Sequence, residues 1–438
     1  MSAASVMERS RDVLRAASPY RALGRVQRVR GLIIESLGPR ATIGELCRIG
    51  ARDEQRLAEV VGFNGSTTLL MALEDIGGLY PGSEVEALRR PLTIGLSRHL
   101  LGRAVNALGI PMDGGPAIPV SERRSLQAHA PHPLRRRRVT RPLSVGIRSI
   151  DGLLTLGEGQ RVGIFAGSGI GKSVLLGMMA QFTEADVVVI GLIGERGREV
   201  RDFIEKYLGE EGLRKSVLVI ETSDRWPLLR IKGAMTTTTI AEYFRDQGLK
   251  VLLLMDSVTR VCHAFREVGL SLGEPPATRG YPPSVFAALP KLLERSGNAD
   301  NGSITALYTV LVEGDDHTEP VADIVRSILD GHIVLSRKLA ERNHYPAVDV
   351  LTSVSRVMPD VTTKEHSTGA GAVKEIMAAY NEADDLISVG AYAKGTRPLV
   401  DRAIAKMPAI NAFLRQQLYE SSDFRQAVVG VGELAKTE

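Results

Sequence analysis

Buried apolar runs alternate with longer amphipathic stretches between about Arg141 and Arg356, and this alternation is the strongest pattern in the chain. Short continuous apolar runs are typical of strands covered on both faces of a parallel sheet. The pattern predicts strands at Arg161–Phe165, Val187–Ile193, Ser216–Glu221, Val251–Asp256 and Ile304–Val312, and helices at Ser173–Phe182, Arg198–Leu208, Thr239–Gln247 and Val285–Arg295. This order predicts a doubly wound α/β domain, in which ligands bind at the carboxyl edge of a parallel sheet.

The chain on either side of this region has different patterns. From Arg21 to Thr93, short apolar runs alternate with turn formers, and Asn64-Gly65 is a strong hairpin signal, so we expect a small β-barrel. After Thr362, apolar residues at three- and four-residue spacing predict helices at Ala370–Ala383 and Lys406–Tyr419. The expected organisation is an amino-terminal segment (1–20), the barrel (21–93), a proline- and arginine-rich connecting segment (94–146), the α/β domain (147–360) and a helical carboxyl-terminal domain (361–438).

Composition narrows the class of protein only slightly. The chain has 438 residues, of which 44% are hydrophobic and 24% charged, so it can bury a core and is not a disordered or collagen-like chain. A net charge of +4 is too small to indicate nucleic-acid binding by itself. The two cysteines, Cys47 and Cys262, cannot form a disulfide framework and favour a reduced, cytosolic setting. Because no apolar run approaches the roughly 20 residues needed to cross a bilayer, we expect a soluble protein that can still dock on a membrane complex.

The clearest chemical signal is Ala166-Gly-Ser-Gly-Ile-Gly-Lys-Ser173, which lies between a predicted strand and a predicted helix. Glycines in such a loop let successive backbone N–H groups point at phosphate oxygens, and the next helix adds its positive end. Lys172 is expected to reach the β- and γ-phosphates, and Ser173 to bind Mg²⁺ through its hydroxyl. The predicted nucleotide-binding residues of the loop are Gly167, Ser168, Gly169, Ile170, Gly171, Lys172, Ser173 and Val174. A chance glycine turn would explain neither the strand before it nor the Lys-Ser pair and helix after it.

Two carboxylates follow other predicted strands. Asp256 ends Val251–Asp256 and is the candidate Mg²⁺ anchor; its alternative role is to cap the helix that follows. Glu195, just after Val187–Ile193, can accept a proton from an attacking water, and Arg196 can neutralise charge on the γ-phosphoryl group. A capping carboxylate with a solvated arginine at a helix start explains the Glu-Arg pair equally well from the residues alone.

Several long motifs together resemble the type III secretion ATPases, the flagellar-export and injectisome relatives of the catalytic subunit of rotary ATP synthases. They are the phosphate loop, Gly194-Glu-Arg-Gly-Arg-Glu199, Leu253-Leu-Met-Asp-Ser-Val-Thr-Arg260, Arg279-Gly-Tyr-Pro-Pro-Ser-Val-Phe286, Leu329-Asp-Gly-His-Ile-Val-Leu-Ser-Arg337 and His344-Tyr-Pro-Ala-Val-Asp349. The resemblance runs from about Arg21 to Gln426. It implies a RecA-like P-loop ATPase core that binds ATP and Mg²⁺, between a small β-barrel and carboxyl-terminal helices.

The resemblance also implies roles for individual residues. Lys172 and Ser173 would contact phosphate and Mg²⁺, Asp256 would be the Mg²⁺ carboxylate, and Glu195 would be the base that polarises water. Arg356 matches an arginine finger offered to the ATP of the neighbouring subunit, and such a finger is worth on the order of 10³–10⁵ in turnover. Tyr345 would stack on adenine, with Phe424 a weaker candidate for the other face of the base.

For the whole molecule, the resemblance implies a cytoplasmic ring, with a hexamer expected, peripherally associated with the inner-membrane export gate. It would hydrolyse ATP to release chaperones from export substrates and unfold them, working with stalk and peripheral stator proteins. The loop Glu267–Pro276 would face the ring's pore, unless it is a plain connector. The run Arg135–Arg138 is interpreted as a solvated linker, because no aromatic residues accompany it, and no nucleic-acid partner is expected.

Other functions remain open at this point. One is a hexameric nucleic-acid motor resembling the terminator Rho, which would need base-stacking aromatics on the barrel, where only Phe63 and Tyr80 occur. Another is a non-catalytic ring subunit, which would lack the water-activating carboxylate that Glu195 supplies. A rotary synthase subunit is ranked below both. The residues do not distinguish a flagellar from an injectisome enzyme, although Thr318–Asp323 and Asn343–Pro346 lean slightly toward the injectisome.

Overall fold

The structure is a computed structural model that describes residues 7, 11, 23–50, 55–312 and 319–436. Most of the expected amino-terminal segment (1–20) and Thr318 lie outside the described residues. The chain divides into two compact units, Met1–Leu92 with Leu270–Gly273, and Thr93–Gly269 with Glu274–Glu438.

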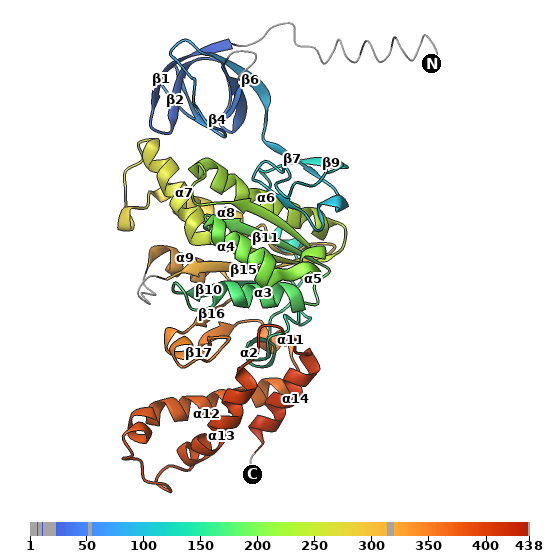
Figure 1. Cartoon of the computed structure of the whole chain (residues 1–438), viewed down its shortest axis with the longest axis vertical. Helices are drawn as coiled ribbons and strands as arrows, with labels where there is room; N and C mark the ends of the chain where they lie inside the picture. The colour runs from blue at the N-terminus through green and yellow to red at the C-terminus, as the bar shows by residue number, and fades with distance from the viewer. Residues whose placement is uncertain (1–6, 8–10, 12–22, 51–54, 313–318, 437–438) are drawn as a thin grey trace. The chain divides into compact units, whose positions relative to one another are not determined.

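The first unit contains a closed six-stranded barrel, which confirms the expected β-barrel (Figure 1). Its strands, in barrel order, are β1 (Leu23–Arg30), β2 (Ile33–Leu37), β5 (Thr67–Ala72), β4 (Arg56–Asn64), β3 (Glu45–Ile49) and β6 (Glu84–Pro91). The predicted hairpin at Asn64-Gly65 joins β4 to β5, and Gly65 has the positive φ of +59° that favours glycine in such turns. Cys47 is fully buried in the barrel core, where burial raises the pKa of its thiol to about 12.

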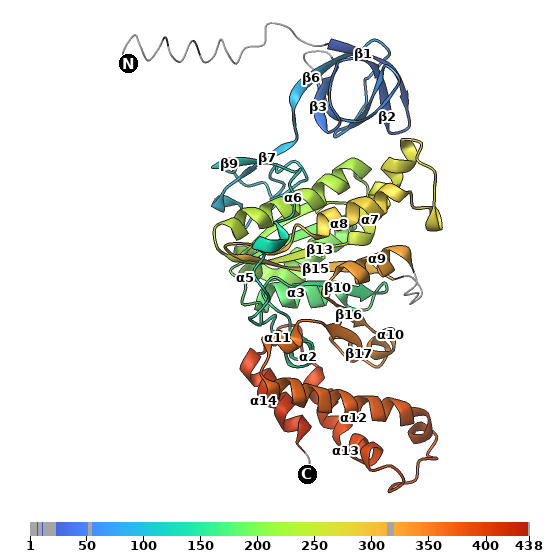
Figure 2. The ribbon, with the colours of Figure 1, turned by 180° about the vertical axis from the view of Figure 1, so that it is seen from behind.

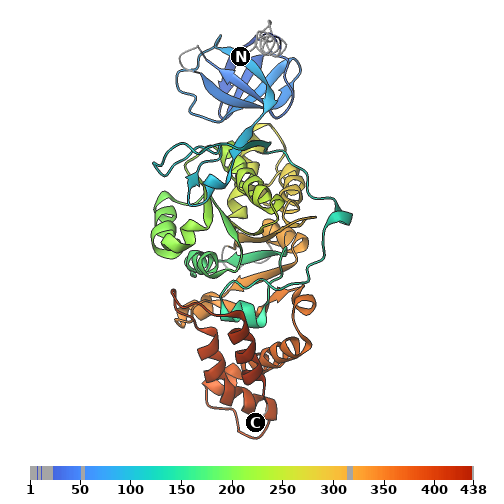
Figure 3. The same cartoon turned by 90° about the vertical axis from the view of Figure 1, so that its right-hand side faces the viewer.

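The second unit is built on a nine-stranded sheet with helices on both faces (Figure 3). The sheet order is β17 (Val348–Ser355), β16 (Gly331–Leu335), β10 (Arg161–Ala166), β15 (Ser303–Leu311), β13 (Lys250–Asp256), β11 (Val187–Ile193), β12 (Ser216–Glu221) and β8 (Ala104–Val105), with β14 (Gly297–Asn298) beside β15. The predicted buried strands are all present, and β11, for example, is buried along its whole length.

The expected parallel sheet is confirmed for the central strands, and two further strands pair antiparallel with it. Strand β17 runs antiparallel to β16, and β14 runs antiparallel to β15. Neither β16 nor β17 was among the predicted strands. Five of the eight β17 positions are polar or exposed, so this edge strand lacks the continuous apolar run by which the central strands are recognised. A separate two-stranded sheet pairs β7 (Thr93–Leu96) with β9 (Glu122–Ser125).

The helices around the sheet differ in extent from those expected. Those of the α/β region are α2 (Arg148–Leu153), α3 (Lys172–Phe182), α4 (Gly197–Asp202), the π-helical η3 (Phe203–Leu208), α5 (Gly209–Arg214), α6 (Pro227–Asp246), α7 (Val258–Ser271), α8 (Pro283–Leu293), α9 (Pro320–Ile328), α10 (Arg337–Glu341) and α11 (Met358–Val361). Short 3₁₀ turns are η1 (Arg98–Leu100), η2 (Pro133–Arg135) and η4 (Thr278–Gly280). The expected loop Glu267–Pro276 is helical over its first part, because α7 continues to Ser271.

The longest difference is in α6, which begins twelve residues before the expected helix Thr239–Gln247. The middle of α6 contains a run of threonines, Thr236–Thr239, which are poor helix formers because their branched side chains lose rotamer freedom. In the folded chain these hydroxyls are buried and satisfied: Thr237 donates to the Gly233 carbonyl at 2.8 Å, and Thr238 to that of Ala234 at 2.9 Å. Packing against β11, β12 and β13 therefore outweighs the local preference.

The carboxyl-terminal part is helical, as expected, with α12 (Lys364–Ser388), α13 (Pro398–Leu414) and α14 (Phe424–Ala435). Helices α12 and α13 lie side by side, and α14 packs on α12 and α2 (Figure 2). The expected helix Lys406–Tyr419 ends too late and α14 was missed. The chain leaves α13 at Arg415 because the next residue, Gln416, is buried against Gly146 and Arg148.

Candidate nucleotide-binding site

The phosphate loop connects the carboxyl end of β10 to the first turn of α3, where the sequence places it. Gly169 and Gly171 have φ values of +77° and +88°, which non-glycine residues rarely adopt. A Cβ on Gly171 would also come within 3.3 Å of the Tyr345 ring, so glycine is needed there for space as well. Ile170 is buried in the core and anchors the loop. The eleven-residue helix α3 begins at Lys172, and its backbone N–H groups and dipole favour an anion at this end.

Three charged groups meet behind the loop. The Lys172 ammonium forms an ion pair with Asp256 Oδ1 and lies 3.4 Å from Glu195 Oε1. Asp256, at the end of β13, is 2% exposed and also accepts a hydrogen bond from the Thr309 hydroxyl at 2.7 Å. Glu195 follows β11, the strand next to β13, so the ends of neighbouring strands bring the three groups together.

The surroundings of this cluster raise the pKa of both Glu195 and Lys172, which favours the neutral form of the carboxyl group and the charged form of the amine. Burial, reinforced by the charge of Asp256, raises the pKa of Glu195 to about 7, and Lys172 only partly offsets this. Burial disfavours the charge of Lys172, but Asp256 and Glu195 outweigh it and raise the pKa of the ammonium. Lys172 is therefore a fixed positive charge, whereas Glu195 can hold or release a proton near neutral pH.

The donor set beside the loop fits Mg²⁺. The Ser173 hydroxyl and the Asp256 carboxylate are hard oxygen ligands, the type that Mg²⁺ prefers. Asp256 is buried with a cation already beside it in the form of the Lys172 ammonium, so its surroundings favour positive charge.

A cleft of about 930 Å³ is lined by the phosphate loop and by both charged and apolar side chains. Tyr345, Pro346 and Leu418, the last from the segment between α13 and α14, are among its apolar and aromatic lining residues. The remaining lining residues include Val174, Leu175, Met178, Tyr207, Arg260, Arg337, Gln416 and Gln417. Charged groups for phosphates together with apolar side chains for a base suit the two halves of a nucleotide.

The structure brings some of the other predicted residues to this cleft and leaves some elsewhere. Arg196 lines the cleft with 79% of its side chain exposed, and its Nη1 lies 3.5 Å from Glu199 Oε1. Phe424 does not lie in the cleft; its ring packs edge-on against His366, with 6.1 Å between the ring centroids. Arg356 is exposed and follows β17, whose last residue, Ser355, pairs with Gly331 at the start of β16. This is the amino edge of the parallel strands, opposite the phosphate loop.

Sequence reasoning missed Gln416 and Leu418 as cleft residues. They follow α13 by only two and four residues, and nothing in their spacing distinguishes them from the helix. The only local signal is the polar Gln-Gln pair at the point where the apolar pattern of α13 stops.

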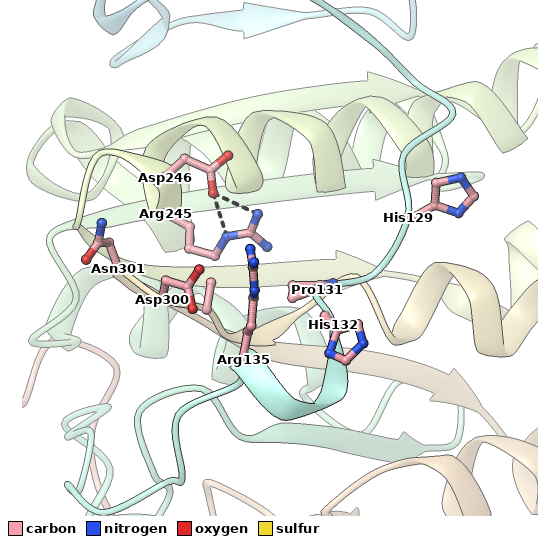
Figure 4. A pocket seen from close by; sticks show the side chains of 9 residues that line it. His129, Pro131, His132, Arg135, Arg245, Asp246, Asp300 and Asn301 are labelled. Carbon is pink, nitrogen blue, oxygen red and sulfur yellow. Dashed lines mark hydrogen bonds and ion pairs between the residues drawn. The ribbon is translucent and has the colours of Figure 1, made fainter.

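The sequence suggested that the arginine run Arg135–Arg138 is a solvated linker. In the structure, two of these arginines bond to backbone carbonyls. Arg136 donates to the Ser296 carbonyl at 2.6 Å, and Arg137 donates to those of Ala299 and Gly302 at 3.0 and 2.9 Å. Arg135 points into a separate hollow of about 400 Å³ beside the ion pair of Arg245 with Asp246 (Figure 4). Backbone carbonyls at the α8–β14 and β14–β15 turns attract these guanidinium groups, a partner set that linear spacing does not show.

No helix within the described ranges is long and apolar enough to span a membrane.

Comparisons with known proteins show the family of this chain. Residues 146–355 match the nucleotide-binding domain of the ATP synthase alpha/beta family, residues 26–89 match its beta-barrel domain, and residues 362–431 match the T3SS EscN ATPase C-terminal domain. The chain is 49% identical over 430 residues to the flagellum-specific ATP synthase of Bacillus subtilis, covering 98% of each chain. It is 50% identical over 426 residues to the type 3 secretion system ATPase of Xanthomonas euvesicatoria, covering 97% of this chain and 96% of that protein.

Solved structures of type III secretion ATPases are also similar to this chain. The assembled ATPase EscN from the enteropathogenic E. coli type III secretion system superimposes with a TM-score of 0.90 at 47% identity, covering 94% of this chain and all of that one. EscN in complex with its central stalk EscO gives a TM-score of 0.88 at 46% identity, with the same coverage. The chain therefore belongs to the flagellar and type III secretion ATPases of the ATP synthase alpha/beta family.

Proposed function

We propose that this protein is the ATPase of a type III protein export system, flagellar or injectisome, and that adjacent copies share each hydrolytic site. The observation that carries this proposal is the separation of its charged groups. Lys172, Glu195 and Asp256 meet at the phosphate loop, whereas Arg356 lies at the opposite edge of the same sheet.

Within one copy, the cleft can bind and orient the nucleotide. Backbone N–H groups of the loop and the Lys172 ammonium hold the phosphates, and Tyr345 and Leu418 enclose the base. Lys172 exchanges its ion pairs with Asp256 and Glu195 for the phosphate oxygens. Ser173 and Asp256 would hold Mg²⁺, which would supply Lewis-acid neutralisation of charge on the phosphates. Glu195 then accepts a proton from the attacking water, and Arg196 faces the developing charge.

Arg356 completes the site of a neighbouring copy. Strand β10 has six residues, so about 17 Å of extended chain separate the amino edge from the phosphate loop. An arginine side chain cannot span that length back into its own cleft. A head-to-tail ring places the amino edge of one copy against the carboxyl edge of the next. The relative EscN is known as an assembled ATPase, and we expect a homo-oligomer, with six copies, here too.

Family membership also suggests which other proteins this ATPase works with. EscN has been solved with its central stalk EscO, and we expect a stalk protein to contact this ring as well. We further propose that the ring works on the cytoplasmic side of an inner-membrane export gate, with peripheral stator proteins. There it releases chaperones from export substrates and unfolds those substrates, with the helices α12–α14 as the docking region.

Mixing two inactive variants tests the shared site. Arg356→Ala is expected to retain nucleotide binding and lose about 10³-fold in turnover, the low end of the value of an arginine finger. Lys172→Ala is inactive because it lacks the phosphate contact. A mixed ring contains boundaries with both groups intact, so steady-state ATPase assays of the mixture should recover part of the wild-type rate. A mixture that stays as inactive as its components excludes a shared site.

A further inference from the structure

A buried hydrogen-bond cluster joins the amino end of β10 to the residue that carries the arginine finger. Gln160, directly before β10, is fully buried. Its Nε2 donates to the Asp330 carbonyl at 3.2 Å and to the Ser355 hydroxyl at 3.1 Å. Its Oε1 accepts a hydrogen bond from the Gly157 backbone at 2.9 Å, so both ends of the amide are used. A buried amide with three hydrogen-bond partners holds them in one geometry.

Asp330 is the centre of this cluster. Its carboxylate accepts hydrogen bonds from Arg161 Nε at 3.1 Å and Nη2 at 3.2 Å, a bidentate contact to the first residue of β10. Its carbonyl accepts not only from Gln160 but also from the Arg356 backbone N–H at 3.1 Å. The main chain of the finger is thus fixed to β10 through one residue.

Ser355, the residue before Arg356, provides a second connection between Gln160 and the finger residue. Its hydroxyl accepts from Gln160 and donates to the Thr155 carbonyl at 2.8 Å. The packing around this path leaves no spare room, since a Cβ on Gly331 would lie 2.5 Å from the Val354 carbonyl and 3.2 Å from Gln160 Nε2. The end of β17 is therefore held tightly on both sides of the finger residue.

We infer that Gln160 is a positioning residue for Arg356, and that it couples the phosphate loop of one copy to the site of the next copy. Strand β10 carries Gln160 at one end and the phosphate loop at the other, so a shift of the strand on nucleotide binding moves the Gln160 amide and with it the finger. This role rests on the shared site proposed above. Gln160 itself touches no nucleotide, because it acts from the amino edge.

The test asks on which side of a subunit boundary a Gln160 variant is defective. Gln160→Leu keeps the volume and removes all three hydrogen bonds. We expect it to bind a non-hydrolysable ATP analogue within about twofold of wild type and to lose about 10- to 100-fold in turnover, the effect of misplacing a catalytic group by about 1 Å. The variant is then mixed separately with Lys172→Ala and with Arg356→Ala, and the ATPase rates are compared with those of the unmixed proteins.

A defective finger gives one pattern of rescue only. Lys172→Ala supplies intact fingers to the intact phosphate loops of Gln160→Leu, so this mixture gains turnover severalfold. Arg356→Ala supplies no finger, so that mixture gains nothing. The reverse pattern, rescue by Arg356→Ala alone, places the defect in the variant's own cleft and overturns the role, as does wild-type turnover of Gln160→Leu.

Two further variants serve as a substitute for Gln160→Leu and as its control. If Gln160→Leu does not fold, Ser355→Ala removes one branch of the cluster and must show the same pattern of rescue. Thr305→Val is the matched control, because it removes buried hydrogen bonds to Gly157 and Gly159 in the same turn without touching Asp330 or Ser355. Its rescue by Lys172→Ala alone would show that any damage to this turn disables the finger, against the role of Gln160. Failure of the Lys172→Ala and Arg356→Ala pair to complement each other would instead refute the shared site itself.

Discussion

At the scale of single residues, the proposed role of Glu195 as general base makes turnover depend on its protonation. Its pKa of about 7, raised by burial and by Asp256, means that a proton occupies the carboxylate below neutral pH and leaves it above. A general base works only when deprotonated. Turnover is therefore expected to fall as pH drops below about 7. The profile of kcat/KM against pH measures this limb, because kcat/KM reports the ionisation of groups in the free enzyme.

Glu195→Gln is the control for this assignment. It keeps the shape of the side chain, removes the base and is expected to lower kcat by about 10²- to 10⁴-fold, with the acidic limb abolished. Nucleotide binding should persist, since Lys172 and the loop are unchanged. Wild-type turnover in this variant would favour a nucleotide-binding subunit without catalysis, and an unchanged acidic limb would assign the pH dependence to another group.

At the scale of elements, the segment between α13 and α14 lines the cleft where we propose that the base binds, and α2 holds this segment. Arg148 donates to the Phe413 carbonyl at 2.8 Å, binds the Arg415 carbonyl and pairs with Glu420. Arg148→Ala should loosen this segment and raise the KM for ATP by about tenfold, a loss of about 1.4 kcal/mol, with kcat nearly unchanged. Steady-state kinetics over a range of ATP concentrations separates the two parameters.

Arg342→Ala serves as the comparison for Arg148→Ala. It removes an exposed arginine whose ion pair with Asp384 on α12 measures 3.6 Å. Exposed pairs of this kind contribute little, so neither KM nor kcat should change. If Arg148→Ala lowers kcat and leaves KM unaltered, the segment acts on the reaction and not on the binding of the base.

At the scale of the whole molecule, a site completed by a second copy makes activity depend on assembly. Turnover per subunit is expected to rise with protein concentration as the copies associate, and to reach a plateau when the rings are complete. ATPase assays across a dilution series, with sedimentation measured in parallel, test this. Arg356→Ala should assemble in the same way and stay nearly inactive throughout. A rate per subunit that is constant down to a strictly monomeric preparation contradicts the proposal.

Local physics explains which parts of this protein could be predicted. The central strands are continuous apolar runs and the phosphate loop is a glycine-rich turn between a strand and a helix, so both are properties of neighbouring residues. The long motifs placed the chain in its family for the same reason. Helix α6 was predicted only in part, because its threonine hydroxyls are satisfied by carbonyls one helical turn earlier and its packing against the sheet outweighs their low propensity.

The sequence by itself determined the five central strands, the glycine-rich loop between β10 and α3 and the carboxylates at the ends of β11 and β13. Only the tertiary structure decided that Arg356 lies at the opposite edge of the sheet, that its backbone N–H and the Gln160 amide share the Asp330 carbonyl, that Leu418 lines the cleft and that Phe424 does not. The physical reason is sequence distance. Gln160 and Ser355 are 195 positions apart, and their hydrogen bond depends on the pairing of β10, β16 and β17, which no local pattern encodes.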